Sequence, residues 1–206
     1  MTSQGETEWG WVHRDVNLSP KEAMQTLIEF DRVILECRAL FEAKTRDYGT
    51  SWRVFRLPSL TDQLYIKACR IRNIEQNGFH LVAEGVRPEW QALINYAIMA
   101  LIQQELGECA EDSCSLEQAI THFDQQVARN RQLLANKNHD YGEAWRAMRT
   151  TSLTDMVLVK LLRIKQIEEN RGEALVSEGV EGGYRDILNY AVFAIIRLDN
   201  PDQTTE

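Results

Sequence analysis

Residues 44–77 read KTRDYGTSWRVFRLPSLTDQLYIKACRIRNIEQN, and the pattern returns 93 positions later, where residues 137–170 read KNHDYGEAWRAMRTTSLTDMVLVKLLRIKQIEEN. The two stretches are identical at 17 of 34 positions. After one extra residue the match resumes, with EGV at 84–86 and 178–180, and with INYA at 94–97 against LNYA at 188–191. A period this long indicates a duplicated domain of roughly 80–90 residues, because solenoid repeats are shorter.

The duplication divides the chain into two copies of one unit. We expect an N-terminal extension at 1–18, copy one at 19–107, a linker at 108–114, copy two at 115–199 and a tail at 200–206. Each copy alone approaches the size at which a single hydrophobic core is marginal. We therefore expect the copies to pack against each other as an internal pseudo-dimer, and the sequence leaves a further homodimer open.

Periodic apolar positions and only four prolines predict helices along the whole chain. Ser19 and Pro20 form a helix start, with Ser19 as the cap. The expected helices span about 20–44, 59–77 and 89–106 in copy one, and about 115–138, 152–170 and 183–198 in copy two. No stretch predicts a strand. The fold class is therefore all-α, with two tandem three-helix repeats packed as a pseudo-two-fold helical bundle.

Composition limits the function classes. The net charge of −8 argues against binding bulk nucleic acid, which requires a basic surface, but a small phosphate ligand needs only a local basic pocket. No stretch approaches the roughly 20 apolar residues of a membrane span, and the first 20 residues lack the apolar region of a signal peptide. None of the four cysteines forms a CxxC pair, so we expect reduced thiols and a cytoplasmic location.

The first repeated polar motif is KxxDYG, with Lys44, Asp47 and Tyr48 in copy one. Lys137, Asp140 and Tyr141 repeat it in copy two. A helix C-terminus would explain the lysine and the glycine, since lysine complements the helix dipole and glycine adopts a left-handed conformation. It does not require the aspartate and the tyrosine. We interpret the aspartates as candidate metal ligands or bases and the tyrosines as candidate stacking groups for a base.

Tryptophan and arginine follow each KxxDYG motif. Trp52 and Trp145 are favoured as core anchors, with stacking on a base as the alternative. Arg56 and Arg149 are expected in loops, where arginine can bind phosphate through two hydrogen bonds.

The next shared motif is SLTD, at residues 59–62 and 152–155. Its first residues, Ser59 and Ser152, are predicted to cap the helices that follow. The same helix N-termini could instead bind an anion through free backbone N–H groups.

Two cations lie one helical turn apart in each copy: Lys67 and Arg70, then Lys160 and Arg163. Like charges on one helix face repel each other unless an anion lies near them. That anion is either a carboxylate of a neighbouring helix or a phosphate of a ligand, and the recurrence of the pair slightly favours the phosphate.

Further polar residues accompany the last helix of each copy. Asn95 and Asn189 stand within apolar runs, where an unpaired amide would cost about 1–3 kcal/mol, so we expect each to support the site or to bond a neighbouring helix. Glu84 and Glu178 precede these helices in the EGV triplets. Asp186 has alanine as its counterpart in copy one, at residue 92, so a site that uses this carboxylate is complete only in copy two.

The ordered motifs KxxDYGxxW, SLTD, KxxRI and EGV…NYA resemble the nucleotide modification associated domain family in its tandem bacterial form, over roughly residues 30–198. The chain is more distantly similar to the MazG-like all-α nucleoside triphosphate pyrophosphatases, whose clustered carboxylates hold Mg²⁺. It lacks the ExxE helix followed by ExxD of those enzymes. The resemblance implies a helical protein of nucleotide metabolism.

Together these features predict a nucleotide- or phosphate-binding protein, with Mg²⁺-dependent hydrolysis as the finer expectation. Phosphates would bind the eight basic residues Lys44, Lys137, Arg56, Arg149, Lys67, Arg70, Lys160 and Arg163. Catalysis would use Asp47, Asp140, Glu84 and Glu178, with Asp140, Asp186 and Glu178 as Mg²⁺ ligands. The alternative is an interaction module without enzymatic activity, in which the repeated charges form salt bridges between helices.

Overall fold

The computed structural model describes residues 20–78, 85–107, 114–170 and 179–201, and this part of the chain is helical without a strand. Copy one contains α1 (Pro20–Tyr48), α2 (Leu57–Asn77) and α3 (Arg87–Leu106). Copy two contains α4 (Leu116–Tyr141), α5 (Thr150–Glu169) and α6 (Gly179–Asp199). The predicted all-α class and the order of three helices per copy are confirmed.

The helix boundaries differ from the sequence prediction at several ends. α1 and α4 do not stop at residues 44 and 138 but continue to Tyr48 and Tyr141, so each DY pair lies in the last helical turn. The glycines that follow have φ values of 65° and 67°, and glycine adopts such positive values more easily than other residues. α6 begins at Gly179, before the predicted start at residue 183.

Two short 3₁₀ helices were not expected from the sequence. They are η1 (Ser51–Val54) and η2 (Ala144–Ala147), and they turn the chain between the first and second helix of each copy. A four-residue helix is too short to show a hydrophobic period, so apolar periodicity does not predict it.

The start of α4 shows how a local sequence fixes a helix end. The Ser115 hydroxyl accepts a hydrogen bond from the Gln118 backbone N–H, and the Gln118 side chain accepts one from the Ser115 N–H. This reciprocal arrangement is a capping box. The predicted cap at Ser19 lies outside the described residues.

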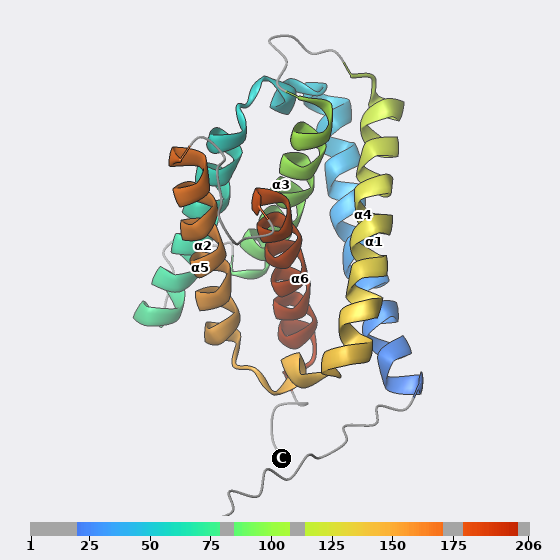
Figure 1. The fold of residues 1–206 in the computed structure, drawn as a ribbon, viewed down its shortest axis with the longest axis vertical. Helices are drawn as coiled ribbons and strands as arrows, with labels where there is room; N and C mark the ends of the chain where they lie inside the picture. Colours follow the sequence, from blue (N-terminus) through green and yellow to red (C-terminus); the bar gives the residue numbers. More distant parts are fainter. Residues whose placement is uncertain (1–19, 79–84, 108–113, 171–178, 202–206) are drawn as a thin grey trace, which may run out of the picture.

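Corresponding helices of the two copies lie beside each other in three layers (Figure 1). The α3–α6 pair forms the central layer, with the α2–α5 pair on one side and the α1–α4 pair on the other. The central position of α3 and α6 explains why their sequences are apolar on almost every face.

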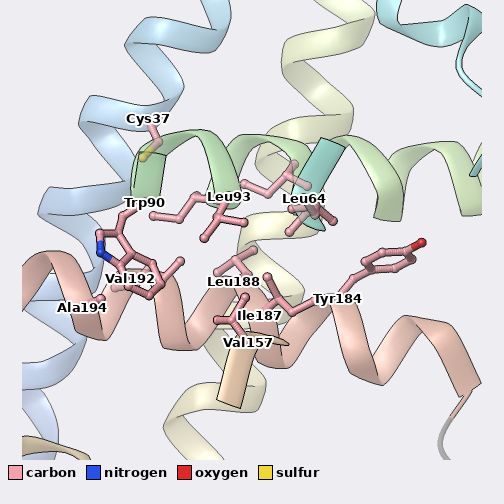
Figure 2. Close-up of a cluster of buried hydrophobic side chains, with 14 of the residues drawn as sticks. Cys37, Leu64, Trp90, Leu93, Val157, Tyr184, Ile187, Leu188, Val192 and Ala194 are labelled. Atoms are coloured by element: carbon pink, nitrogen blue, oxygen red, sulfur yellow. The ribbon is translucent and has the colours of Figure 1, made fainter. Parts of the chain in front are cut away.

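A single core joins the two copies at this central layer. Leu93 of α3 lies close to Ile187 and Leu188 of α6, together with Leu64 of α2 and Val157 of α5 (Figure 2). All five side chains are completely buried. Because each copy contributes to the same core, neither copy buries its apolar face without the other.

Ion pairs between α1 and α4 are reciprocal. Arg38 Nε lies 2.7 Å from Asp124 Oδ1, and Arg131 Nε lies 2.7 Å from Asp31 Oδ1. The residues of the second pair are the counterparts of those in the first, at the repeat offset of 93. Such an exchange is the property of a two-fold related interface, so these contacts support the predicted pseudo-two-fold packing.

Within the described residues, Cys37 and Cys69 are free thiols, and burial raises the pKa of Cys37 to about 12. No helix in the described part of the chain is both long enough and apolar enough to cross a bilayer.

Candidate functional site

Copy two contains a pocket of about 680 Å³ between α4, η2, α5 and α6. This volume lies within the range of about 300–1,000 Å³ that is usual for small-molecule sites. We call it the copy-two pocket. Its polar lining side chains include Lys137, Asn138, Tyr141, Lys160, Arg163, Asp186, Asn189 and Tyr190.

Each of the surrounding elements supplies a distinct part of the lining. The last turn of α4 brings Lys137, Asn138 and Tyr141, and the chain then turns at Gly142 into η2. α5 contributes Lys160 and Arg163 from successive turns, and α6 contributes most of the remaining wall. The tertiary fold therefore brings together Lys137 and Tyr141 of KxxDYG, both cations of KxxR, and the asparagine and tyrosine of NYA in copy two.

Asp186 lies between two lysines at the centre of this site. Its Oδ1 is 2.8 Å from Lys137 Nζ, and its Oδ2 is 2.6 Å from Lys160 Nζ. Burial raises the pKa of Asp186, but the hydrogen bonds and charges of the two lysines outweigh burial and hold the pKa below its ordinary value. Asp186 is therefore a carboxylate at neutral pH.

Arg163 and Tyr190 complete the polar side of the pocket. Arg163 is exposed, lines the pocket and forms no ion pair with any described residue. Burial, followed by the charge of Asp186, raises the pKa of Tyr190, although Arg163 lowers it. Tyr190 is therefore a neutral hydrogen-bonding phenol at physiological pH. Among the described lining residues, three cations face one carboxylate.

Two buried donors that belong to residues of the pocket lining have no hydrogen-bond partner in the described structure. They are Asn138 Nδ2 and Trp145 Nε1, and both side chains are less than a tenth exposed. An unpaired buried polar group costs about 1–3 kcal/mol, so a ligand or water that accepts from these donors would bind favourably.

The rings of the two predicted stacking tryptophans are largely buried. The Trp145 ring is stacked on Phe193 with centroids 4.2 Å apart, and the Arg146 guanidinium lies 4.4 Å from the same ring centroid. Two groups at these distances occupy opposite faces of the ring. Trp52 packs against Phe41 in copy one. The geometry therefore favours the core-anchor interpretation of both tryptophans and leaves Tyr141, which is 75 % exposed, as the accessible aromatic group.

Copy one provides its own carboxylate for the equivalent cations. Glu89 Oε2 lies 3.1 Å from Lys67 Nζ, and the other Glu89 oxygen accepts a hydrogen bond from Arg70. The Glu89 side chain is almost fully buried. The sequence analysis left open whether a carboxylate of a neighbouring helix or a phosphate of a ligand balances these cations. In copy one it is a carboxylate of the protein.

The SLTD motif does not cap its helices, and that prediction was wrong. α2 and α5 begin at Leu57 and Thr150, and their N-cap residues are Arg56 and Arg149, without a side-chain cap. Ser59 and Ser152 therefore lie in the first turn, because the helices start earlier than the motif. Neither arginine lines the copy-two pocket.

Other residues of the motif link the two copies instead. The Thr61 hydroxyl donates to Glu168 Oε1 at 2.7 Å, and the Thr154 hydroxyl donates to Glu75 Oε1 at 2.8 Å. Asp62 pairs with Lys165 and Asp155 pairs with Arg72. These contacts are again reciprocal between α2 and α5.

The remaining predicted residues are dispersed. Lys44, Asp47 and Tyr48 are exposed on the last turns of α1. Asp140 is also exposed and lies 3.1 Å from His139, outside the pocket lining. Glu84 and Glu178 lie outside the described residues.

The two repeated asparagines hold helices together. Asn95 Nδ2 donates to the Cys37 carbonyl at 3.2 Å, and Asn189 Oδ1 accepts from Asn130 Nδ2 at 2.7 Å. This agrees with the helix-packing interpretation, and Asn189 also lines the pocket.

The predicted metal ligands do not gather in the described structure. No group of three or more His, Cys, Asp or Glu side chains in residues 20–78, 85–107, 114–170 and 179–201 is placed to hold a metal ion. Both Asp186 oxygens are already bound by lysines. The described residues therefore do not form a protein-built Mg²⁺ site.

Sequence reasoning assigned no role to Glu89, Asn138 or Tyr190. The tyrosine had a signal, because it belongs to the repeated NYA motif. The other two are replaced in the opposite copy, by glycine and threonine, so comparison of the copies could not find them.

The fold and the pocket define an all-helical, internally duplicated protein whose second copy contains a pocket lined by three cations and one carboxylate. The chain belongs to the family Nucleotide modification associated domain 1, whose model matches residues 44–104 and 137–198. The two segments begin at Lys44 and Lys137 and cover more than half of the chain. No curated protein and no solved structure matches the chain.

Proposed function

We propose that the protein binds a small phosphate-bearing ligand of the nucleotide class in the copy-two pocket. The observation that carries the proposal is the lining charge, because Lys137, Lys160 and Arg163 face a single carboxylate, Asp186. An anion entering this pocket would meet an excess of positive charge although the whole chain carries a net charge of −8.

The uncharged residues of the pocket lining support the proposal that the ligand is a nucleotide rather than inorganic phosphate. Tyr141 offers an exposed ring for stacking on a base, and Asn138 and Trp145 offer buried donors without partners in the described structure. The pocket volume exceeds what one phosphate group requires. The description of the family, nucleotide modification, is consistent with this ligand class.

Catalysis and Mg²⁺ are separate proposals that the same experiments test. Mg²⁺ would arrive on the phosphates of the nucleotide, since the described carboxylates do not build a site for it. We derive no hydrolytic step, because Asp186 is held by two lysines and Asp140 lies outside the pocket lining.

The first experiment is a thermal-shift screen against nucleoside mono-, di- and triphosphates, each with and without Mg²⁺. A ligand present at 100 times its Kd should add about 2.7 kcal/mol of stability. A rise in Tm for one ligand class supports the proposal, and product analysis of the same mixtures tests hydrolysis. A flat screen over all classes contradicts it.

Lys137→Met tests where the ligand binds, and Lys44→Met is its matched control in copy one. Removing Lys137 should weaken binding of the selected nucleotide about tenfold or more, because a hydrogen bond to a charged group contributes about 1.5–3 kcal/mol. Asp186 keeps Lys160 as its partner, so the variant should fold. Lys44→Met should bind as the parent protein does. Calorimetric titration measures both, and equal affinities would place the site elsewhere.

A second candidate function is favoured by the contacts of copy one. There the repeated cations Lys67 and Arg70 bind Glu89, and the SLTD residues join α2 to α5. These features belong to an interaction module whose charges are architectural. The flat outcome of the nucleotide screen would favour this candidate.

A further inference from the structure

The two copies differ at one position that faces their paired cations. Glu89 of α3 aligns with Gly183 of α6 at the offset that matches INYA to LNYA. The cations themselves are unchanged, since Lys67 and Arg70 align with Lys160 and Arg163. Copy one therefore shows how an anion can contact both members of this Lys–Arg pair.

In copy one a single carboxylate bridges both cations. One Glu89 oxygen lies 3.1 Å from Lys67 Nζ and the other accepts from Arg70 Nη1. The carboxylate is buried while both cations are about 29 % exposed, so the anion sits on the inner side of the pair.

In copy two no side chain can take this place. A Cβ on Gly183 would lie 2.8 Å from the Ile164 side chain, so α6 approaches α5 too closely there for a larger residue without rearrangement. Lys160, Arg163 and Gly183 all line the pocket. The carboxylate of the pocket lining, Asp186, pairs with Lys160 and Lys137, and Arg163 has no ion-pair partner in the described structure.

We propose that an oxyanion of the ligand bridges Lys160 and Arg163 beside Gly183, in the role that the Glu89 carboxylate has in copy one. This inference rests on the proposed function and refines it. The bridging group is a compact oxyanion with at least two oxygens free, such as a phosphate monoester. One oxygen accepts from Arg163, and another shares Lys160 with Asp186, which keeps Lys137 as its second partner.

The proposed subsite also determines how many ligand molecules bind to each chain. The equivalent cations of copy one are already bound by Glu89, which is part of the chain and competes at a high effective concentration. The protein therefore binds one such phosphate-bearing ligand per chain, in copy two.

Calorimetric titration with adenosine monophosphate, and line broadening of inorganic phosphate in ³¹P NMR, test the subsite. Arg163→Gln should weaken binding of both probes about tenfold or more, while Arg163→Lys, which keeps the charge, should retain most of the affinity. Arg46→Gln is the control, because it removes the same charge from an exposed position outside the pocket. It should leave both affinities unchanged.

The outcomes separate this inference from the proposed function. Binding by the parent protein that Arg163→Gln leaves unchanged would overturn the subsite alone. A stoichiometry of two per chain would also overturn it, because copy one would then be open. Absence of binding by the parent protein in the nucleotide screen and with both probes would overturn the proposed function itself.

Discussion

At the scale of single residues, the two copies balance their paired cations with carboxylates from different positions. Copy one uses Glu89, whereas copy two uses Asp186, one helical turn further along the equivalent helix. The two carboxylates differ in which cations they bind. Glu89 binds both cations of its pair, but Asp186 binds Lys160 and the α4 residue Lys137. This one-turn displacement leaves Arg163 without an ion-pair partner among the described residues.

Asp186→Asn should destabilise the protein at pH 7 by about 1–3 kcal/mol, because the amide cannot balance Lys137 and Lys160. The pKa of Asp186 is lowered in the folded protein from its ordinary value of 3.8, so the unfolded state binds the proton more readily. The stabilisation is therefore present above about pH 4 and is lost as the pH falls through the folded-state pKa. Urea unfolding of both proteins between pH 7 and pH 3 measures the difference.

The control for this substitution is Asp124→Asn, since Asp124 forms an exposed ion pair with Arg38. Its effect should be within about 1 kcal/mol. A difference between parent and Asp186→Asn that grows toward pH 3 would have the wrong sign and would refute the electrostatic account.

At the scale of elements, the SLTD motif shows how a residue pattern can fit two roles. Serine followed by aspartate is typical of a helix start, and nothing in the motif itself favours a contact with another helix. The observed helices begin before the motif. The threonines and aspartates of the motif then face the opposite copy, where Thr61 bonds Glu168 and Thr154 bonds Glu75.

Thr61→Val and Thr154→Val should each lower the free energy of unfolding by about 1–2 kcal/mol, because a half-buried carboxylate on the other copy loses a donor. The effect should be larger for Thr61, whose hydroxyl also lies 2.7 Å from the Tyr184 hydroxyl. Chemical unfolding measures both. Thr121→Val is the control, since this exposed threonine donates to the carbonyl of Glu117 in its own helix. Equal effects at all three positions would contradict the proposed link between copies.

At the scale of the whole molecule, the central α3–α6 layer makes the two copies one folding unit. Trp90 of α3 and Tyr184 of α6 are completely buried, as are the leucines and isoleucines around them (Figure 2). Separating the copies would expose this shared surface to water, at a cost of about 25 cal/mol per Å² of apolar area.

Each copy produced alone should therefore lack a cooperative unfolding transition. A chain divided between residues 110 and 111 should recover that transition when the two halves are mixed in equal amounts, because the reciprocal contacts can form again. Circular dichroism during thermal unfolding reports both results. A half that unfolds cooperatively as a monomer would show that it has a sufficient core of its own.

The sequence by itself determined the helical class, the duplication, the order of helices and the family. It did so because apolar periodicity and a repeated motif are properties of neighbouring residues, which need no knowledge of the partner helix. It also identified Lys137, Lys160, Arg163 and Asp186 as candidates, by comparing the copies with each other.

Only the tertiary structure decided which of the repeated charges are architectural and which line a pocket. Lys67 and Lys160 are equivalent in sequence, yet one is matched with a buried glutamate and the other faces a pocket. The difference arises from residues of another helix, Glu89 against Gly183, and the charge state and accessibility of a side chain depend on what is packed against it.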